Sequence, residues 1–264
     1  MNKNVQIGVF DSGVGGITIW QEIVNRLPHE NTLYLADNIN APYGFKSKTK
    51  IIEYSIKNTQ FLLSKGAKLI VVACNTATTN VIDILRHTFP NVPFIGVEPA
   101  IKPAALLSKN KRIAVLATYN TLHSNEFLEA VKKPYMDQVE VFPITGMGLV
   151  PLIEENKIYS YEMEQLITKY SQIMISEEID YLVLGCTHYP YIKQQLQKAL
   201  PTHIKIIDSG EAVARQTEVI LKKNNLLNTQ REIGQHQFYY NDPLRSIEAF
   251  VPQAHNIKLA FHEF

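Results

Sequence analysis

Residues 68–78 read KLIVVACNTAT, and residues 180–190 read DYLVLGCTHYP. Each segment begins with a charged residue, continues through a short apolar run, and ends in Cys followed by polar residues. Continuous apolar runs are typical of central parallel strands, because helices cover both faces of such a sheet. Each segment therefore predicts a buried strand with a thiol, Cys74 or Cys186, at its carboxyl end, where open α/β sheets present their ligand sites.

Similar apolar runs alternate with amphipathic, helix-length segments along most of the chain, which predicts an α/β fold. The predicted strands are residues 5–10, 32–36, 68–73, 93–96, 112–117, 138–142, 181–185, 205–207 and 236–240. The predicted helices include residues 15–26, 47–65, 76–87, 160–177, 191–199 and 210–224. The similarity of the two cysteine segments suggests two half-similar α/β units, with residues 90–103 and 201–208 as the connections between them.

Composition excludes several classes of protein. The 264 residues are 45% hydrophobic and 19% charged, as in ordinary globular proteins of one large or two small domains. No apolar run approaches the ~20 residues of a membrane span, and a net charge of +1 without a basic block gives no footprint for nucleic acid or a membrane surface. Asp11 and the glycines after it interrupt the first apolar run too early for a signal peptide, so we expect a cytoplasmic protein.

The chain has only two cysteines, and a cytoplasmic location argues against a disulfide between them. No Cys-x-x-Cys and no His/Cys cluster has metal-ligand spacing, so we expect no metal. The simplest interpretation of such a cysteine is a small buried apolar residue. The matched strand-end positions, with Thr187 and His188 beside Cys186, instead favour functional thiols.

The segment FDSGVGG, residues 10–16, lies between a predicted strand and a predicted helix. Thr18 stands where a dinucleotide fingerprint needs its third glycine, and no P-loop lysine follows, so a tight turn is the simpler interpretation. Asp11 and Ser12 nevertheless enter the strand-end crevice, beside a helix N-terminus that can bind a carboxylate.

Three other polar groups follow predicted strands or apolar runs, and each has a simple structural explanation. Residues 40–44, which read NAPYG, have turn composition. Thr118 and Thr121 suit helix N-capping, and Glu154 on its own would be a solvated side chain.

Two thiols suit a reaction that inverts a carbon centre, because one base removes a proton from one face while an acid delivers a proton to the other. Ser12, Asn75, Thr76 and Thr187, together with helix N-terminal amides, would donate hydrogen bonds to substrate carboxylates. A hydrolase or amidase with Cys186 as nucleophile and His188 as base is an alternative, but it leaves Cys74 without a role. A two-lobed small-molecule binding protein is another alternative, and it has no need for two strand-end thiols.

The sequence resembles the glutamate racemases of the aspartate/glutamate racemase family. The matching segments occur in the family's order and cover residues 7 to about 210: GVFDSGVGG, ADNINAPYG, VVACNTAT, GVEPA, VLATYNT, GLVPLIE and LGCTHYP. The resemblance implies an isomerase that interconverts L- and D-glutamate without a cofactor and supplies D-glutamate for peptidoglycan synthesis, and thus for cell wall biogenesis and cell shape. It also implies two pseudo-symmetric open-sheet α/β domains, residues 1–97 plus 207–264 and residues 98–206, with the active site between them, and a homodimer.

By the same resemblance, Cys74 takes the α-proton of D-glutamate and Cys186 that of L-glutamate. Asp11 assists Cys74, while Glu154 and His188 assist Cys186. The positions that match substrate-binding residues are Asp11, Ser12, Pro42, Tyr43, Gly44, Asn75, Thr76, Thr118, Thr121, Thr187 and His188. The chain has Ala117 where the family often has Gly. Aspartate racemases share the two-cysteine fold, so the choice between glutamate and aspartate as substrate stays open.

Overall fold

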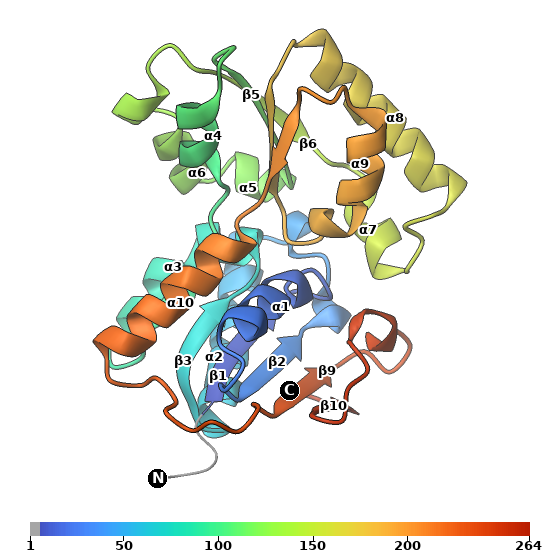
Figure 1. The fold of residues 1–264 in the computed structure, drawn as a ribbon. Coiled ribbons are helices and arrows are strands. Elements are labelled where there is room, and N and C mark those ends of the chain that lie inside the picture. The colour runs from blue at the N-terminus through green and yellow to red at the C-terminus, as the bar shows by residue number, and fades with distance from the viewer. Residues whose placement is uncertain (1–5) are drawn as a thin grey trace. The chain divides into compact units, whose positions relative to one another are not determined.

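The computed structural model describes residues 6–264, and the chain divides into two compact units (Figure 1). The first unit contains the residues up to Val97 together with Gly210–Phe264, and the second contains Glu98–Ser209. The boundary expected from the sequence, between residues 206 and 207, lies three residues earlier. Val5, the first residue of the predicted strand 5–10, lies outside the described residues.

The first unit is built on a six-stranded parallel sheet with the order β10-β9-β2-β1-β3-β4. Its strands are β1 (Gln6–Asp11), β2 (Thr32–Ala36), β3 (Ala67–Val72), β4 (Phe94–Gly96), β9 (His236–Tyr240) and β10 (Ile257–Phe261). The central strands β1, β2 and β3 are buried over most of their length, which explains their continuous apolar sequences.

Helices cover both faces of this sheet (Figure 1). On one face, α2 (Lys48–Ser64) and α3 (Asn75–Thr88) pack on β1, β2 and β3 around a core that includes Phe10, Leu62 and Val72. On the other face, α1 (Ile17–Arg26) packs against α10 (Gly210–Lys223). The short helices η1 (Asn38–Asn40), η2 (Tyr43–Phe45) and η5 (Glu248–Phe250) lie in the connections.

The second unit is built on a four-stranded parallel sheet with the order β6-β5-β7-β8. Its strands are β5 (Arg112–Ala117), β6 (Glu140–Thr145), β7 (Tyr181–Gly185) and β8 (Lys205–Ile207). Its helices are α4 (Ile101–Leu107), α5 (Tyr119–Leu122), α6 (Asn125–Ala130), α7 (Leu149–Glu154), α8 (Tyr161–Ser176) and α9 (Lys193–Ala199), with η3 (Pro134–Met136) and η4 (Tyr189–Ile192). Helix α4 packs on β5 and β7, and α8 packs on α9.

The predicted α/β fold with two parallel sheets is confirmed, while several element bounds differ from the sequence prediction. Strand β6 begins at Glu140 rather than at Gln138, because Gln138 has a φ of +62° and belongs to the preceding turn. Pro143 is accommodated in β6 because this strand lies at the sheet edge. Strand β10 and the short helices α4 to α7 were not predicted. Within residues 6–264, no helix has both the length and the hydrophobicity to span a membrane.

Candidate active site

Cys74 lies at the carboxyl end of β3, two residues after Val72, and is the N-cap of helix α3. Its Sγ accepts a hydrogen bond from the backbone N–H of Ala77 at 3.5 Å. Only 5% of the residue is exposed. The unpaired N–H groups and the dipole of a 14-residue helix therefore favour negative charge on this sulfur.

Asp11 and Ser12 lie beside Cys74 at the end of the neighbouring strand. The pairing of Phe10 with Val72 brings the ends of β1 and β3 together, and Ser12 Oγ lies 3.8 Å from Cys74 Sγ. Asp11 is fully buried and accepts a hydrogen bond from the backbone N–H of Gly13 at 2.9 Å. The turn predicted from FDSGVGG thus carries an acid and a hydroxyl to a thiol.

Close packing explains why position 16 of this turn is a glycine. A Cβ at this position would lie 2.7 Å from the Cβ of Asp11 and 2.9 Å from that of Ala73. Only glycine allows the start of α1 to approach both strand ends so closely.

The connection after β2 brings Tyr43 to the same part of the first unit. Its hydroxyl donates to Asp37 Oδ2 at 2.5 Å and accepts from Asn58 Nδ2 at 3.2 Å. Burial, the Asp37 carboxylate and the negative charge of the Cys74 sulfur raise the pKa of Tyr43 well above its usual value. Tyr43 therefore stays protonated and acts as a fixed hydrogen-bond donor to Asp37 rather than as an acid.

The remaining predicted residues of the first unit lie in the connection after β2 and at the start of α3. Pro42 follows a cis peptide bond after Ala41, and Gly44 is buried in η2 beside Tyr43. Asn75 and Thr76 are buried in the first turn of α3, and Asn75 Nδ2 donates to Val97 O at 3.1 Å.

Cys186 occupies the equivalent position in the second unit, directly after β7. Its Sγ lies 3.6 Å from His188 Nδ1, and His188 Nε2 lies 2.5 Å from Glu154 Oε1 at the end of α7. The side chains of His188 and Glu154 are 4% and 6% exposed. The three groups form a buried thiol–imidazole–carboxylate chain.

Two opposing effects act on His188. Burial lowers the pKa of the imidazole, while the hydrogen bonds and negative charges of Cys186 and Glu154 raise it, and the net result is a pKa well above the usual value. In this state both ring nitrogens carry protons, so one donates to the sulfur and the other to the carboxylate. The imidazolium consequently places a positive charge and an N–H donor next to the Cys186 sulfur.

The three threonines predicted for the second unit lie at the same sheet edge. Ala117 pairs with Gly185, which places Thr118 beside Cys186 at adjacent strand ends. Thr118 Oγ1 lies 3.0 Å from Thr121 Oγ1 and caps α5, as its structural interpretation expected. Thr187 is buried next to Cys186.

The structure adds three residues that the sequence did not single out as site residues. Asp37 and Asn58 hold the Tyr43 hydroxyl. Tyr189 is fully buried beside Cys186, and burial and the sulfur's negative charge raise its pKa well above the usual value. Asn58 comes from the middle of a helix, where one asparagine among amphipathic residues carries no recognisable signal.

Each half of the predicted site therefore contains a buried thiol with a hydrogen-bonding group next to its sulfur. Asp11, Ser12, Tyr43 and Cys74 gather in the first unit, and Glu154, Cys186 and His188 gather in the second. Both cysteines are free thiols. Among residues 6–264, no group of three His, Cys, Asp or Glu side chains is arranged to hold a metal ion. A stabilised thiolate can act as a base or as a nucleophile.

The chain is similar to known proteins of one family. Residues 7–217 match the family model described as Asp/Glu/Hydantoin racemase. A glutamate racemase from Pseudomonas aeruginosa is 43% identical over 225 residues, which cover 85% of this chain and 84% of that protein.

Two solved structures are similar over almost the whole chain. The glutamate racemase from Francisella tularensis, solved in complex with D-glutamate, has a TM-score of 0.83 and 31% identity and covers 97% of each chain. The Escherichia coli glutamate racemase, solved with L-glutamate and the activator UDP-MurNAc-ala, has a TM-score of 0.81 and 28% identity and covers 98% of each chain.

Proposed function

The chain belongs to the Asp/Glu/hydantoin racemase family and is an amino-acid racemase, and from this premise we propose that it interconverts L-glutamate and D-glutamate. The single observation that carries the proposed mechanism is the equivalence of the two thiols. Cys74 and Cys186 each follow the carboxyl end of a buried parallel strand, and each sulfur accepts stabilisation from donors of its own unit.

In the proposed reaction the two thiols exchange the roles of base and acid. With D-glutamate, the Cys74 thiolate removes the α-proton and the Cys186 thiol delivers a proton to the opposite face. With L-glutamate, the Cys186 thiolate is the base and Cys74 is the acid. Each turnover thus leaves one thiol and one thiolate, in the arrangement that the opposite isomer needs.

The two thiols are stabilised by different means. The Cys74 sulfur has the N-terminal amides of α3 and the Ser12 hydroxyl, and we assign Asp11 to assist proton transfer on this side. Cys186 has a charged His188 that Glu154 holds in place. We therefore propose a pair with the same role but unequal environments.

The α-proton of an amino acid is a very weak acid, so the site must orient the substrate and stabilise negative charge that develops at the α-carbon. We propose that hydroxyl, amide and backbone groups at the strand ends bind the substrate carboxylates and ammonium. The residues assigned to this role are Asp11, Ser12, Pro42, Tyr43, Gly44, Asn75, Thr76, Thr118, Thr121, Thr187 and His188. Acid and base both come from side chains, so the proposal includes no cofactor and no metal.

We further propose that the product D-glutamate enters peptidoglycan synthesis in the cytoplasm and that the enzyme works as a homodimer. The relationship to an E. coli racemase solved with UDP-MurNAc-ala supports the first part. The dimer follows from the resemblance of the sequence to its family.

The Cys186–His188–Glu154 chain also has the composition of a nucleophilic triad, so one experiment must separate proton transfer from hydrolysis. The enzyme is incubated with each glutamate enantiomer in heavy water, with a chelator and without added cofactor. We expect each isomer to give the other with one deuterium at the α-carbon. Absence of α-deuterium, together with cleavage of glutamine or a glutamyl peptide, would assign the thiols to a hydrolase. Parallel incubation with aspartate tests whether the shorter substrate is accepted.

A further inference from the structure

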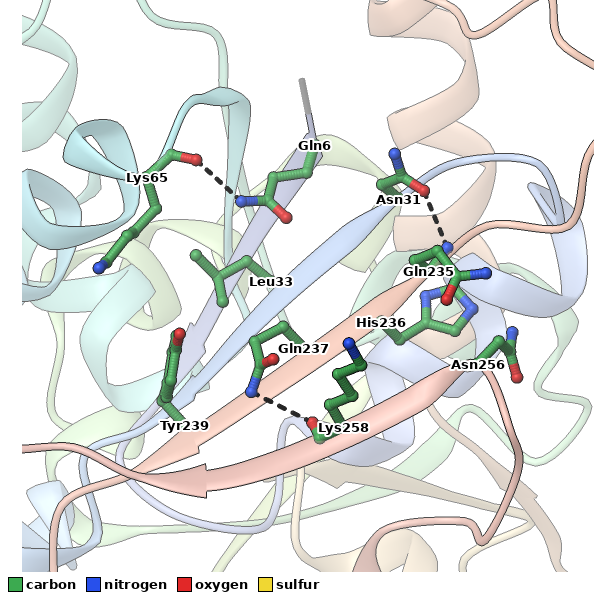
Figure 2. Close-up of a pocket in the computed structure, with 10 residues that line it drawn as sticks. All are labelled: Gln6, Asn31, Leu33, Lys65, Gln235, His236, Gln237, Tyr239, Asn256 and Lys258. Carbon is green, nitrogen blue, oxygen red and sulfur yellow. Dashed lines mark hydrogen bonds between the residues drawn. The ribbon is translucent and has the colours of Figure 1, made fainter. Parts of the chain in front are cut away.

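A polar pocket lies on the sheet of the first unit, at the amino ends of its strands (Figure 2). Cys74 and Asp11 lie at the opposite, carboxyl ends of the strands. The cavity is about 370 Å³, within the usual size range of small-molecule sites. It is independent of the proposed racemase mechanism, since none of the predicted active-site residues lines it.

The strand register explains the shape of this pocket. Gly8, Leu33, Gln237 and Lys258 are successive partners across β1, β2, β9 and β10. Residues two positions earlier in each strand point to the same face of the sheet, because side chains alternate between the two faces. At these four positions the chain has only amide side chains, those of Gln6, Asn31, Gln235 and Asn256.

The helix above this face leaves part of the sheet uncovered. Helix α2 ends at Ser64, and its Leu62 would touch a Cβ on Gly8 at 3.2 Å, so the helix covers the β1 end of the row. Its Phe61 packs edge-on against Tyr239 at a centroid distance of 5.7 Å. The amino ends of β9 and β10 contribute Gln237 and Lys258 to the pocket, and Figure 2 shows both side chains on the same side of the sheet as that of Gln6.

The charges in this pocket are all positive. Lys65 and Lys258 line it, and no Asp or Glu is among its lining residues. Neither ammonium forms an ion pair with any residue in the described range 6–264; the Lys65 Nζ lies only over the Phe61 ring, 5.2 Å from its centroid. Two unpaired ammonium groups beside one cavity favour an anionic ligand.

The amides determine what else the ligand must carry. Gln6 Nε2 donates to Lys65 O at 2.9 Å, Gln237 Nε2 to Phe238 O at 3.0 Å, and Asn256 Nδ2 to Gly234 O at 2.8 Å. A backbone carbonyl only accepts, so these partners fix the orientation of each amide and leave its oxygen as an acceptor. A ligand that complements these oxygens must supply O–H or N–H donors.

We propose that this pocket binds a small hydroxylated organic anion, a sugar acid or a sugar phosphate. The acidic group lies between Lys65 and Lys258, and the hydroxyl groups donate to the amide oxygens of Gln6 and Gln237. The Tyr239 hydroxyl, which has no hydrogen-bond partner among the described residues, is a further donor.

Binding is tested on the full chain by titration calorimetry and by two-dimensional amide NMR with four probes. Gluconate and glucose 6-phosphate carry both features of the proposed ligand and distinguish a carboxylate from a phosphate. Glucose lacks the charge, and hexanoate lacks the hydroxyl groups. We expect gluconate or glucose 6-phosphate to bind and to shift the amide signals of residues 235–239 and 256–258, and we expect neither control probe to do so.

The variant Lys65→Gln/Lys258→Gln should weaken that binding about tenfold or more, while Lys133→Gln/Lys223→Gln, which removes the same charge at exposed positions, should leave it unchanged. The proposal is overturned if neither anion binds, if glucose or hexanoate binds equally well, or if both double variants behave alike. No readout uses racemase activity, so failure here leaves the proposed function untouched, and failure of the racemase assay leaves this proposal untouched.

Discussion

His188 Nε2 lies 2.5 Å from Glu154 Oε1, and both side chains are almost completely buried. A buried carboxylate beside an imidazole holds the ring in one orientation and favours its charged form. Because the other ring nitrogen faces Cys186 Sγ at 3.6 Å, the position of Glu154 is transmitted to the thiol. Glu154 is therefore a positioning residue in the proposed mechanism.

The substitution Glu154→Gln removes the charge but keeps the shape of the side chain. The pKa of His188 should fall, so the imidazolium is lost at lower pH and the alkaline limb of the kcat/KM profile moves to lower pH. We expect kcat/KM to fall about 10–100-fold. The loss must be equal for L- and D-glutamate, because the two isomers have equal free energies in solution. The control Glu155→Gln removes the same charge from an exposed neighbour and should change neither rate nor profile.

The substitutions Cys74→Ser and Cys186→Ser separate the two proton transfers. Each should lower racemisation about 10³-fold or more, because a serine hydroxyl is a much weaker acid and base. A glutamate analogue with a β-leaving group needs only the first proton removal before the leaving group departs. Cys74→Ser should therefore still eliminate from the L-analogue, and Cys186→Ser from the D-analogue, which chromatography of the keto-acid product measures. Elimination from both isomers by either variant would contradict one base per face.

The strands were the part of the fold that sequence could predict. The bounds of β2, β5, β7, β8 and β9 agree with the prediction, since buried parallel strands are written as short runs of apolar, aromatic and β-branched residues. Strand β10 was not predicted, because it is a partly exposed edge strand and lacks a continuous apolar run. Helices α5 and α6 were not predicted, because they have four and six residues, too few to show a periodic pattern. Their N-termini are capped by the side chains of Thr118 and Ser124.

The sequence itself indicated the two cysteines of the site but not the acidic residue that contacts His188. Both cysteines were recognisable because each directly follows a continuous apolar run, residues 69–73 or 181–185. Glu154 lies 34 residues before His188, and nothing local in the sequence distinguishes it from a solvated acid, so only family resemblance pointed to it. The Asn241 partner of Asp37 could not be recognised either, because its Nδ2, which donates to Asp37 Oδ1 at 2.7 Å, lies 204 residues away in the chain.

The hydrogen bonds of the Tyr43 hydroxyl with Asp37 and Asn58 should stabilise the folded state. The substitution Tyr43→Phe removes the hydroxyl that joins Asp37 to Asn58 and leaves a buried carboxylate with one donor fewer. We expect the free energy of unfolding to fall by about 1–3 kcal/mol in urea titrations. Tyr54 is a matched control: its ring lies 5.7 Å from that of Tyr43, and its hydroxyl has no partner among the described residues. Tyr54→Phe should change stability by less than about 0.5 kcal/mol; similar losses for both variants would mean that the hydroxyl contacts carry no special weight.

His236 gives the first unit a pH-dependent stability. Burial lowers the pKa of His236 from 6.5 to about 4. Trp20 Nε1 donates to Thr32 Oγ1 at 2.7 Å, and Thr32 Oγ1 lies 2.9 Å from His236 Nδ1. Burial next to Trp20, whose ring lies edge-on to the imidazole at a centroid distance of 5.3 Å, is therefore the reason for the neutral form.

A depressed histidine pKa means that the unfolded chain binds the proton more readily than the folded chain. The stabilisation is therefore complete above about pH 6.5 and is lost as pH falls toward about 4. We expect the loss to be roughly 1–2 kcal/mol once solvent screening is allowed for. Urea titrations across this range should show that the free energy of unfolding depends less on pH in His236→Gln than in the unsubstituted protein. The control variant His255→Gln, at an exposed position, should leave this pH dependence unchanged. Equal slopes in all three proteins would mean that burial does not lower the pKa of His236 in the folded state.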